Sequence, residues 1–152
     1  MPGALASALH LLGLAIGLGA VFSRGRALRR VAAGDHRAVG SVLAADNFWG
    51  ISALLLIGTG LTRLFAGLDK APDFYLHNWL FWIKMGLFGL ILALETTPMI
   101  AFIRWRIALG RGAAPDTSRA AAFVRLNDAE TALVIVIPFA AAMMARGLWL
   151  IG

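Results

Sequence analysis

The chain has 152 residues, of which 60% are hydrophobic, 14% are charged and none is cysteine. A soluble domain carries about 25% charged residues, so this composition leaves too little polar surface for a soluble fold and indicates an integral membrane protein. The lack of cysteine excludes disulfides and Cys-ligated zinc or iron–sulfur sites, and the net charge of +6 is here a signal of membrane topology.

Four apolar segments predict four transmembrane helices, since a helix needs about 20 mostly apolar residues to cross a bilayer. The first covers about residues 4–23 and is followed, not preceded, by basic residues, which distinguishes it from a signal peptide. The second and third cover about 41–66 and 79–103. The fourth covers about 117–149, after a helix-start signal that includes Pro115 and Asp116. The predicted fold class is an all-α four-helix transmembrane bundle, forming a single domain over residues 1–152.

Arginine is concentrated in two of the three connections. The first and third connections hold ten arginines: Arg24, Arg26, Arg29, Arg30, Arg37, Arg104, Arg106, Arg111, Arg119 and Arg125. The second connection contains Lys70 as its one basic residue. The positive-inside rule therefore predicts that both termini face outward, with anionic lipid headgroups beside the arginines and no nucleic-acid partner. Trp79 and Trp105 are predicted to mark opposite membrane interfaces.

Ionisable residues at membrane depth are costly and are the natural candidates for function. At 100° per residue, His77, Lys84 and Glu95 share one face of the third helix, and Asp128 and Arg146 share one face of the fourth. We expect both of these polar stripes to lie inside the bundle. Four carboxylates toward the inner face are expected to form ion pairs with the arginines. These carboxylates are Asp46, Glu95, Asp128 and Glu130.

His10, Gly13 and Gly17 lie on one face of the first helix. One interpretation is close helix packing, because glycine lets another backbone approach. The other is that the glycines leave room for a porphyrin ring beside His10. His10 would then be the axial ligand of the haem iron, and it is the only residue predicted to bind a metal. At about 1.5 Å per residue, His10 is nearer in depth to Lys84 than to His77, which argues against a haem held between the two histidines. The pair His77–Asn78 also fits a helix start, with Asn78 as the N-cap.

Five segments carry a family resemblance: ALHLL (8–12), DNFWG (46–50), FYLHN (74–78), FWIKM (81–85) and TPMI (97–100). They resemble a bacterial family of four-helix inner-membrane proteins of about 150 residues that has no assigned activity, and the resemblance covers nearly the whole chain. It implies a multi-pass protein of the bacterial inner membrane.

Two more distant likenesses concern the histidines. The first-helix Ala8-Leu9-His10, with Leu76-His77 followed by Lys84, is similar to the HemJ-type protoporphyrinogen oxidases, which bind haem b. CopD-like membrane proteins begin with a similar helix. This resemblance implies His10 as a haem ligand, with His77 and Lys84 at the cofactor or its propionates. In HemJ-type proteins the lysine is three residues after the histidine, whereas Lys84 is seven after His77.

Three functions follow from these observations. The first is a structural or accessory subunit, either a homo-oligomer or part of a larger membrane complex, assembled through Gly13 and Gly17. The second is a haem-b-binding redox or haem-handling protein. The third is a proton- or anion-linked carrier that uses Lys84 and Glu95. The sequence contains no phosphate-binding glycine loop and no His-x-x-x-His zinc pair, and it favours a role other than catalysis.

Overall fold

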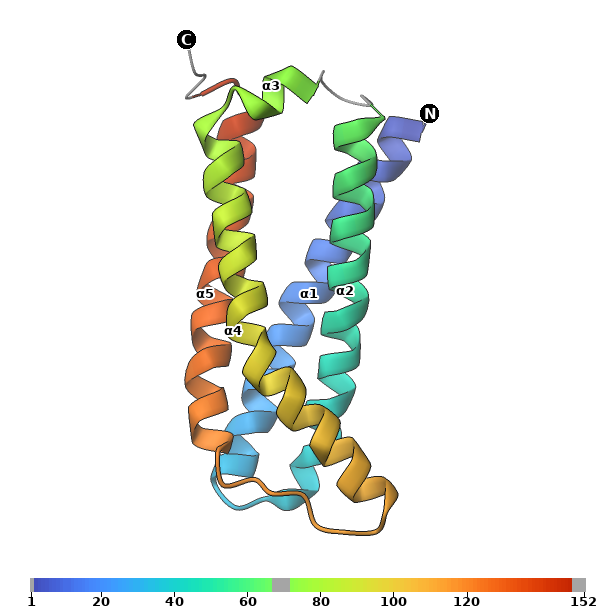
Figure 1. The fold of residues 1–152 in the computed structure, drawn as a ribbon, viewed down its shortest axis with the longest axis vertical. Helices are drawn as coiled ribbons and strands as arrows, with labels where there is room; N and C mark the ends of the chain where they lie inside the picture. The colour runs from blue at the N-terminus through green and yellow to red at the C-terminus, as the bar shows by residue number, and fades with distance from the viewer. Residues whose placement is uncertain (1, 67–71, 149–152) are drawn as a thin grey trace.

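The computed structural model describes residues 2–66 and 72–148, and these residues form an all-α structure (Figure 1). Within them, four helices are long and apolar enough to cross a membrane: α1 (Pro2–Ala32), α2 (Val39–Phe65), α4 (Trp79–Gly110) and α5 (Ala120–Ala145). The short 3-10 helix η1 (His36–Ala38) and the short helix α3 (Pro72–Leu76) lie in the connections. The predicted all-α membrane fold is therefore confirmed.

Several helices end at other residues than predicted, because a helix can continue beyond its apolar segment. Helices α1 and α4 continue nine and seven residues beyond the predicted ends at 23 and 103, because arginine, alanine and leucine favour helix outside the apolar run as well. Gly34 and Gly112, with φ of 95° and 70°, follow these helices in the left-handed conformation that ends many helices. Helix α5 begins at 120, not 117, and ends at 145. The predicted end at 149 lies outside the described residues.

The four long helices form two pairs, α1–α2 and α4–α5, and α1 also packs against α5. Within the described residues, the backbones of α1 and α4 do not approach closely, and the side chains of Arg24 and Glu95 make the contact between them. Figure 1 shows the two pairs separating toward the end where α1 begins and α5 ends, and closing together at the opposite end. We call these the terminal half and the arginine half, because the arginine-rich connections lie at the closed end.

The main apolar core lies in the arginine half. It is built around three aromatic side chains, Phe102, Trp105 and Phe123, whose ring centroids are 5.2–6.1 Å apart. Trp105 is buried, and its Nε1 donates a hydrogen bond of 2.6 Å to the carbonyl oxygen of Asp116. Trp105 is therefore a core residue of the arginine half, and its indole holds the connection to α5.

Polarity in the bundle is reversed relative to a soluble protein. Leu54, Phe65 and Phe139 are exposed on the outer surface, while Arg24 and Glu130 are fully buried. An apolar exterior around polar interior groups is the arrangement that a lipid environment requires. The protein is therefore a multi-pass membrane protein whose outer surface contacts lipid.

Helix α4 changes direction part-way along its length (Figure 1). Pro98 lies inside α4, where it removes one backbone donor and opens the helix on one side. After this point α4 crosses toward α2, and Arg106 reaches the carbonyl oxygen of Leu43 at 3.3 Å. The proline thus brings the end of α4 against α2 in the arginine half.

Candidate functional site

Arg24 lies at the centre of the arginine half and is 1% exposed. It follows Gly17 by seven residues and His10 by fourteen, so the three side-chain positions share the face of α1 that points into the bundle. Its Nε donates to Oδ1 of Asn127 on α5 at 2.9 Å. Asn127 is held in turn by a bond of 3.1 Å from its Nδ2 to the carbonyl oxygen of Val21. The guanidinium is therefore fixed in orientation by a neutral side chain.

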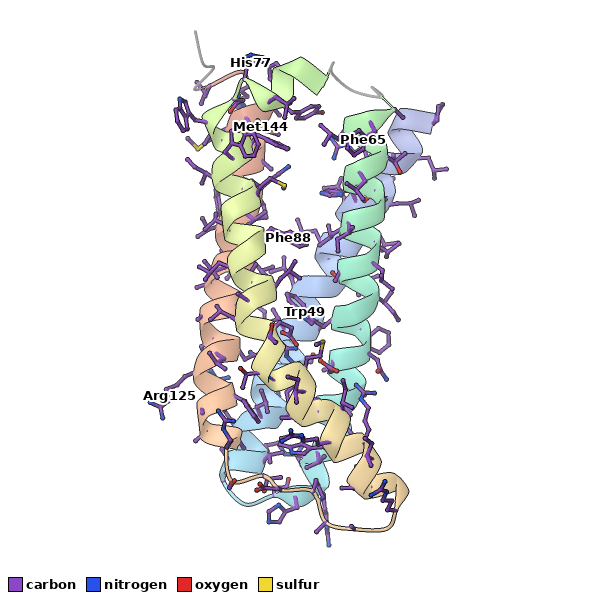
Figure 2. The ribbon with its side chains drawn as sticks, viewed as in Figure 1. Trp49, Phe65, His77, Phe88, Arg125 and Met144 are labelled. Atoms are coloured by element: carbon purple, nitrogen blue, oxygen red, sulfur yellow. The ribbon has the colours of Figure 1, made fainter. Side chains whose placement is uncertain are left out.

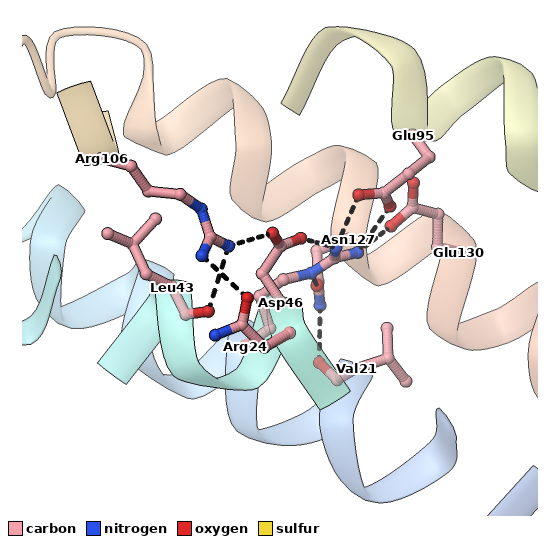
Figure 3. Close-up of polar contacts among 9 residues, drawn as sticks. Val21, Arg24, Leu43, Asp46, Glu95, Arg106, Asn127 and Glu130 are labelled. Atoms are coloured by element: carbon pink, nitrogen blue, oxygen red, sulfur yellow. Dashed lines mark hydrogen bonds and ion pairs between the residues drawn. The ribbon is translucent and has the colours of Figure 1, made fainter. Parts of the chain in front are cut away.

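Three carboxyl groups from the other three long helices converge on this guanidinium (Figure 3). Glu95 of α4 accepts from Nη1 at 2.8 Å and from Nη2 at 2.9 Å. Glu130 of α5 accepts from Nη2 at 2.5 Å, and Asp46 of α2 accepts from Nη1 at 3.3 Å. With the bond to Asn127, these contacts use all five N–H donors of an arginine side chain. Arg24 thereby joins all four membrane-length helices.

A second arginine, Arg106 of α4, extends the cluster toward the arginine-rich connections. Its Nη2 donates to Oδ2 of Asp46 at 2.7 Å, and its Nη1 donates to Oδ1 of Asn47 at 2.8 Å. The Asp46 carboxylate is therefore shared between two guanidinium groups. We call the six side chains that form this network the Arg24 cluster: Arg24, Asp46, Glu95, Arg106, Asn127 and Glu130.

Aromatic side chains cover the Arg24 guanidinium. The Cζ atom of Arg24 lies 5.3 Å from the centroid of the Trp49 ring and 5.9 Å from that of Phe102. These distances are in the range of cation–π attraction. Because the rings exclude water, the ion pairs experience a low dielectric constant, in which each charge depends strongly on its partners.

The terminal half contains a second polar group, His10 of α1. The Nδ1 atom of His10 lies 2.8 Å from Oγ1 of Thr59 on α2. The same hydroxyl donates its single proton to the carbonyl oxygen of Leu55 at 2.5 Å. With that proton donated to Leu55, Thr59 accepts from the His10 tautomer that carries its proton on Nδ1. In the neutral ring, Nε2 then carries the free lone pair.

The surroundings of His10 are cationic and partly open. Arg63 and Lys84 are the charged side chains that act electrostatically on the His10 ring. Lys84 is half-buried on α4, with its Nζ 5.6 Å from the centroid of the Phe81 ring. Figure 2 shows Phe88 extending from α4 toward the α1–α2 pair, and it too is half-buried. Inward-facing side chains are thus less completely covered here than in the arginine half.

A family described as "Predicted membrane protein (DUF2214)" matches residues 3–148, which is nearly the whole chain. The chain belongs to this family. No curated protein and no solved structure matched the chain. Membership of DUF2214 agrees with the resemblance to a family of small membrane proteins, and the activity has to be argued from the residues themselves.

The DUF2214 chain places two of the three residues predicted for a cofactor in the terminal half. These are His10 and Lys84, and Lys84 acts electrostatically on the His10 ring. His77 is exposed and lies directly after α3, at the outer edge of the terminal half (Figure 2). The next residue, Asn78, is the N-cap of α4, because its Oδ1 accepts from the Leu80 amide at 2.8 Å. The predicted helix start at Asn78 is therefore confirmed.

Four ionisable residues predicted to be buried, from three different helices, separate into two groups. Asp46 and Glu95 lie in the Arg24 cluster, with side chains 16% and 12% exposed. Asp128, in contrast, is 49% exposed and pairs with Arg29 on the surface at 2.6 Å, and Arg146 is also exposed.

The reason for this division is the orientation of α5. Its buried face runs through Asn127, Glu130 and Val134. Asp128 lies about 100° around the helix from Asn127. The structure thus places Asp128 and Arg146 outside the bundle, where the sequence had predicted both inside it.

Gly13 and Gly17, the predicted packing residues, lie against α2 of the same chain. A side-chain carbon at Gly13 would lie 3.2 Å from Cβ of Leu55, and one at Gly17 would collide with Oγ of Ser52. Ser52 uses the close approach, because its hydroxyl donates to the carbonyl oxygen of Gly13 at 2.7 Å. The small-residue face therefore accounts for α1–α2 packing within one molecule.

Sequence reasoning counted Arg24 among the arginines of the first connection and missed its central role. The available signal was its spacing, because Arg24 continues the face of His10, Gly13 and Gly17 by another seven residues. Asn127 and Thr59 were missed as well. Neither is ionisable, and neither stands out until the helices have been packed.

Proposed function

We propose that the protein binds haem b in the terminal half of the bundle, with Nε2 of His10 as the axial ligand of the iron, and acts as a redox or haem-handling membrane protein. The observation that carries this proposal is the hydrogen bond from His10 Nδ1 to Thr59. Metal-binding histidines almost always donate their other ring N–H to a fixed acceptor, which sets the tautomer and orients the ring. We assign this arrangement to His10, with Thr59 as the acceptor.

Several neighbouring residues support the fit of this group. Gly60 faces the His10 ring, and a side-chain carbon at Gly60 would lie 3.8 Å from Cε1 of His10. Phe88 supplies an aromatic surface on α4, and the Lys84 ammonium is a suitable partner for a propionate carboxylate. The incomplete burial of His10, Lys84 and Phe88 is consistent with a site completed by a ligand.

When bound, haem supplies one-electron chemistry. The residues of the chain hold and orient it: Thr59 fixes the His10 ring, and Lys84 neutralises a carboxylate at the edge of the ligand. We propose no enzymatic reaction.

The position in the membrane follows from the arginines. The positive-inside rule directs the arginine half to the cytoplasm of a bacterium, with anionic headgroups beside it, and the terminal half outward. The proposed haem site then lies toward the outer face of the inner membrane. We propose that His77 lies at that face, above the site, and is not an iron ligand.

An accessory or oligomeric role was the other main interpretation from the sequence. It depended on Gly13 and Gly17 as a contact surface for a partner, and these two positions are occupied by α2 of the same chain. The structural observations therefore favour the His10 site over this role. The carrier interpretation depended on Lys84 and Glu95, and Glu95 is bound by Arg24 through two hydrogen bonds.

The test is the visible spectrum of protein purified in mild detergent from cells supplied with a haem precursor, before and after reduction with dithionite. We expect a Soret band close to stoichiometric with protein, which His10→Ala removes. His36→Ala is the matched control, because His36 is exposed in the first connection. His77→Ala should also keep the band. A featureless spectrum from a well-folded sample overturns the proposal.

A further inference from the structure

The Arg24 cluster has an unequal number of opposite charges. It contains two guanidinium groups, from Arg24 and Arg106, and three carboxyl groups, from Asp46, Glu95 and Glu130. If all five groups are ionised, two positive charges face three negative ones. An uncompensated charge in a buried site is strongly unfavourable. One more positive charge is therefore needed to make the cluster neutral.

Glu130 is the carboxyl group of the cluster that lacks a partner for one of its oxygens. Its side chain is 0% exposed, and its Oε1 is a buried atom with no hydrogen-bond partner. The groups that face Glu130 are Arg24 from α1, Asp46 from α2 and Glu95 from α4. All five N–H donors of Arg24 are already in use, so this guanidinium has no donor left for Oε1.

Glu95 and Glu130 also lie close to each other. The Nη2 atom of Arg24 is 2.9 Å from Oε2 of Glu95 and 2.5 Å from Oε2 of Glu130, so one nitrogen lies between two carboxyl oxygens. Two carboxyl groups that share a buried position do not both ionise readily. Among the described residues, no group of three His, Asp or Glu side chains is arranged to hold a metal ion. A proton is therefore the positive ligand that fits.

We infer that Glu95 and Glu130 form a proton-binding site that holds one proton at neutral pH, with Glu130 as the protonated member. The proton makes the Arg24 cluster electrically neutral. Glu95 and Asp46 are partly exposed, whereas Glu130 is not, so protons exchange with Glu130 through Glu95. This site is separate from His10 and does not depend on the proposed haem site. It gives the protein a protonatable group near the arginine-rich end of the membrane span.

The experiment is infrared spectroscopy of the full chain in lipid nanodiscs at neutral pH. A protonated carboxyl group has a carbonyl stretching band that is separate from the bands of carboxylates. We expect this band in the wild type, and we expect it to shift when the protein is labelled with 13C in glutamate but not when it is labelled in aspartate. Glu130→Gln should remove the band. The matched control is Asp128→Asn, two residues away on the exposed side of α5, which should leave it unchanged.

Three results would overturn the inference: no such band in the folded wild type, a band that shifts with labelled aspartate, or a band that survives Glu130→Gln. Glutamine replaces a protonated glutamate with little change in shape, so we expect Glu130→Gln to fold. The labelling result on the wild type decides the question independently if that variant does not fold. Loss of the Soret band in His10→Ala bears only on the haem proposal, so the two can fail separately.

Discussion

Nη2 of Arg24 lies 2.5 Å from Oε2 of Glu130, and these side chains are 1% and 0% exposed. The pair joins α1 to α5 deep in the bundle, where neither group has access to water. Glu95 and Asp46 bind the same guanidinium from α4 and α2. Packing of the four helices in the arginine half is therefore coupled to the electrostatics of one side chain.

Replacing Arg24 should destabilise the protein strongly. In Arg24→Gln the three carboxyl groups lose their common partner, and removing one member of a buried ion pair costs about 3–5 kcal/mol. We expect a loss of this size in the free energy of unfolding, measured by denaturant titration in mixed micelles.

Arg29→Gln is the matched control for that prediction. Arg29 lies on the same helix, but its pair with Asp128 is about half exposed on both sides. Exposed pairs contribute about 0–1 kcal/mol. Equal losses in the two variants would contradict a central role for Arg24.

The membrane fold could be predicted from sequence because long apolar segments and asymmetric arginines are local signals. The predicted stripe on the fourth helix shows the limit of such reasoning. The 100° rule correctly aligned Asp128 with Arg146, but it could not say which face of the helix points inward. That depends on the partners of Asn127 and Glu130, which come from α1 and α4.

The candidate site shows the same limit. His10 and Lys84 could be named as candidates because ionisable residues at membrane depth are rare. The bond from His10 to Thr59 joins residues 49 positions apart, and the bond from Arg24 to Glu130 joins residues 106 apart. Such pairings depend on tertiary packing, which helix periodicity does not encode.

Gly17 should be sensitive to a single added methyl group. In Gly17→Ala the new carbon meets Oγ of Ser52, so α1 and α2 must separate or Ser52 must give up its bond to Gly13. Overpacking of this kind costs about 1–3 kcal/mol. Gly19→Ala is the control, because an added carbon there has no neighbour within 4 Å. Gly17→Ala should therefore have the lower free energy of unfolding of the two variants. Equal values would count against tight α1–α2 packing at Gly17.

Asp35, in the first connection, should titrate below its ordinary range. The hydrogen bond from Arg30 lowers the pKa of Asp35 from its usual 3.8, and the Arg37 amide, which Asp35 caps, acts in the same direction. The ionised form therefore stabilises this connection above pH 3.8, and the effect is lost as the pH falls through the lower, folded-state pKa. We expect Arg30→Gln to raise the Asp35 midpoint in a carbon-detected NMR titration. The midpoint of Asp116, whose pKa is lowered by Ser118, should not move.

Thr59 should control the strength of haem binding without touching the iron. Thr59→Val keeps the shape of the side chain but removes the acceptor for the His10 Nδ1 proton. Loss of such a partner usually weakens metal binding by about 10–100-fold. We expect a weakening of this size when the protein is titrated with haem and followed at the Soret band, and Thr59→Ser should restore binding. The control is Thr62→Val, since exposed Thr62 bonds only the carbonyl oxygen of Gly58 on its own helix.

Lys84 should determine whether the ligand's carboxylates contribute to binding. If its ammonium binds a propionate, the wild type should prefer haem to haem dimethyl ester by about tenfold or more, because a hydrogen bond to a charged group contributes about 1.5–3 kcal/mol. Lys84→Met should bind the two ligands equally, through a loss of affinity for haem alone, and Lys84→Arg should keep the preference. Binding constants of both ligands for the three proteins test this directly. An undiminished preference in Lys84→Met would place the carboxylates elsewhere in the terminal half, where Arg63 is the other cation that acts on His10.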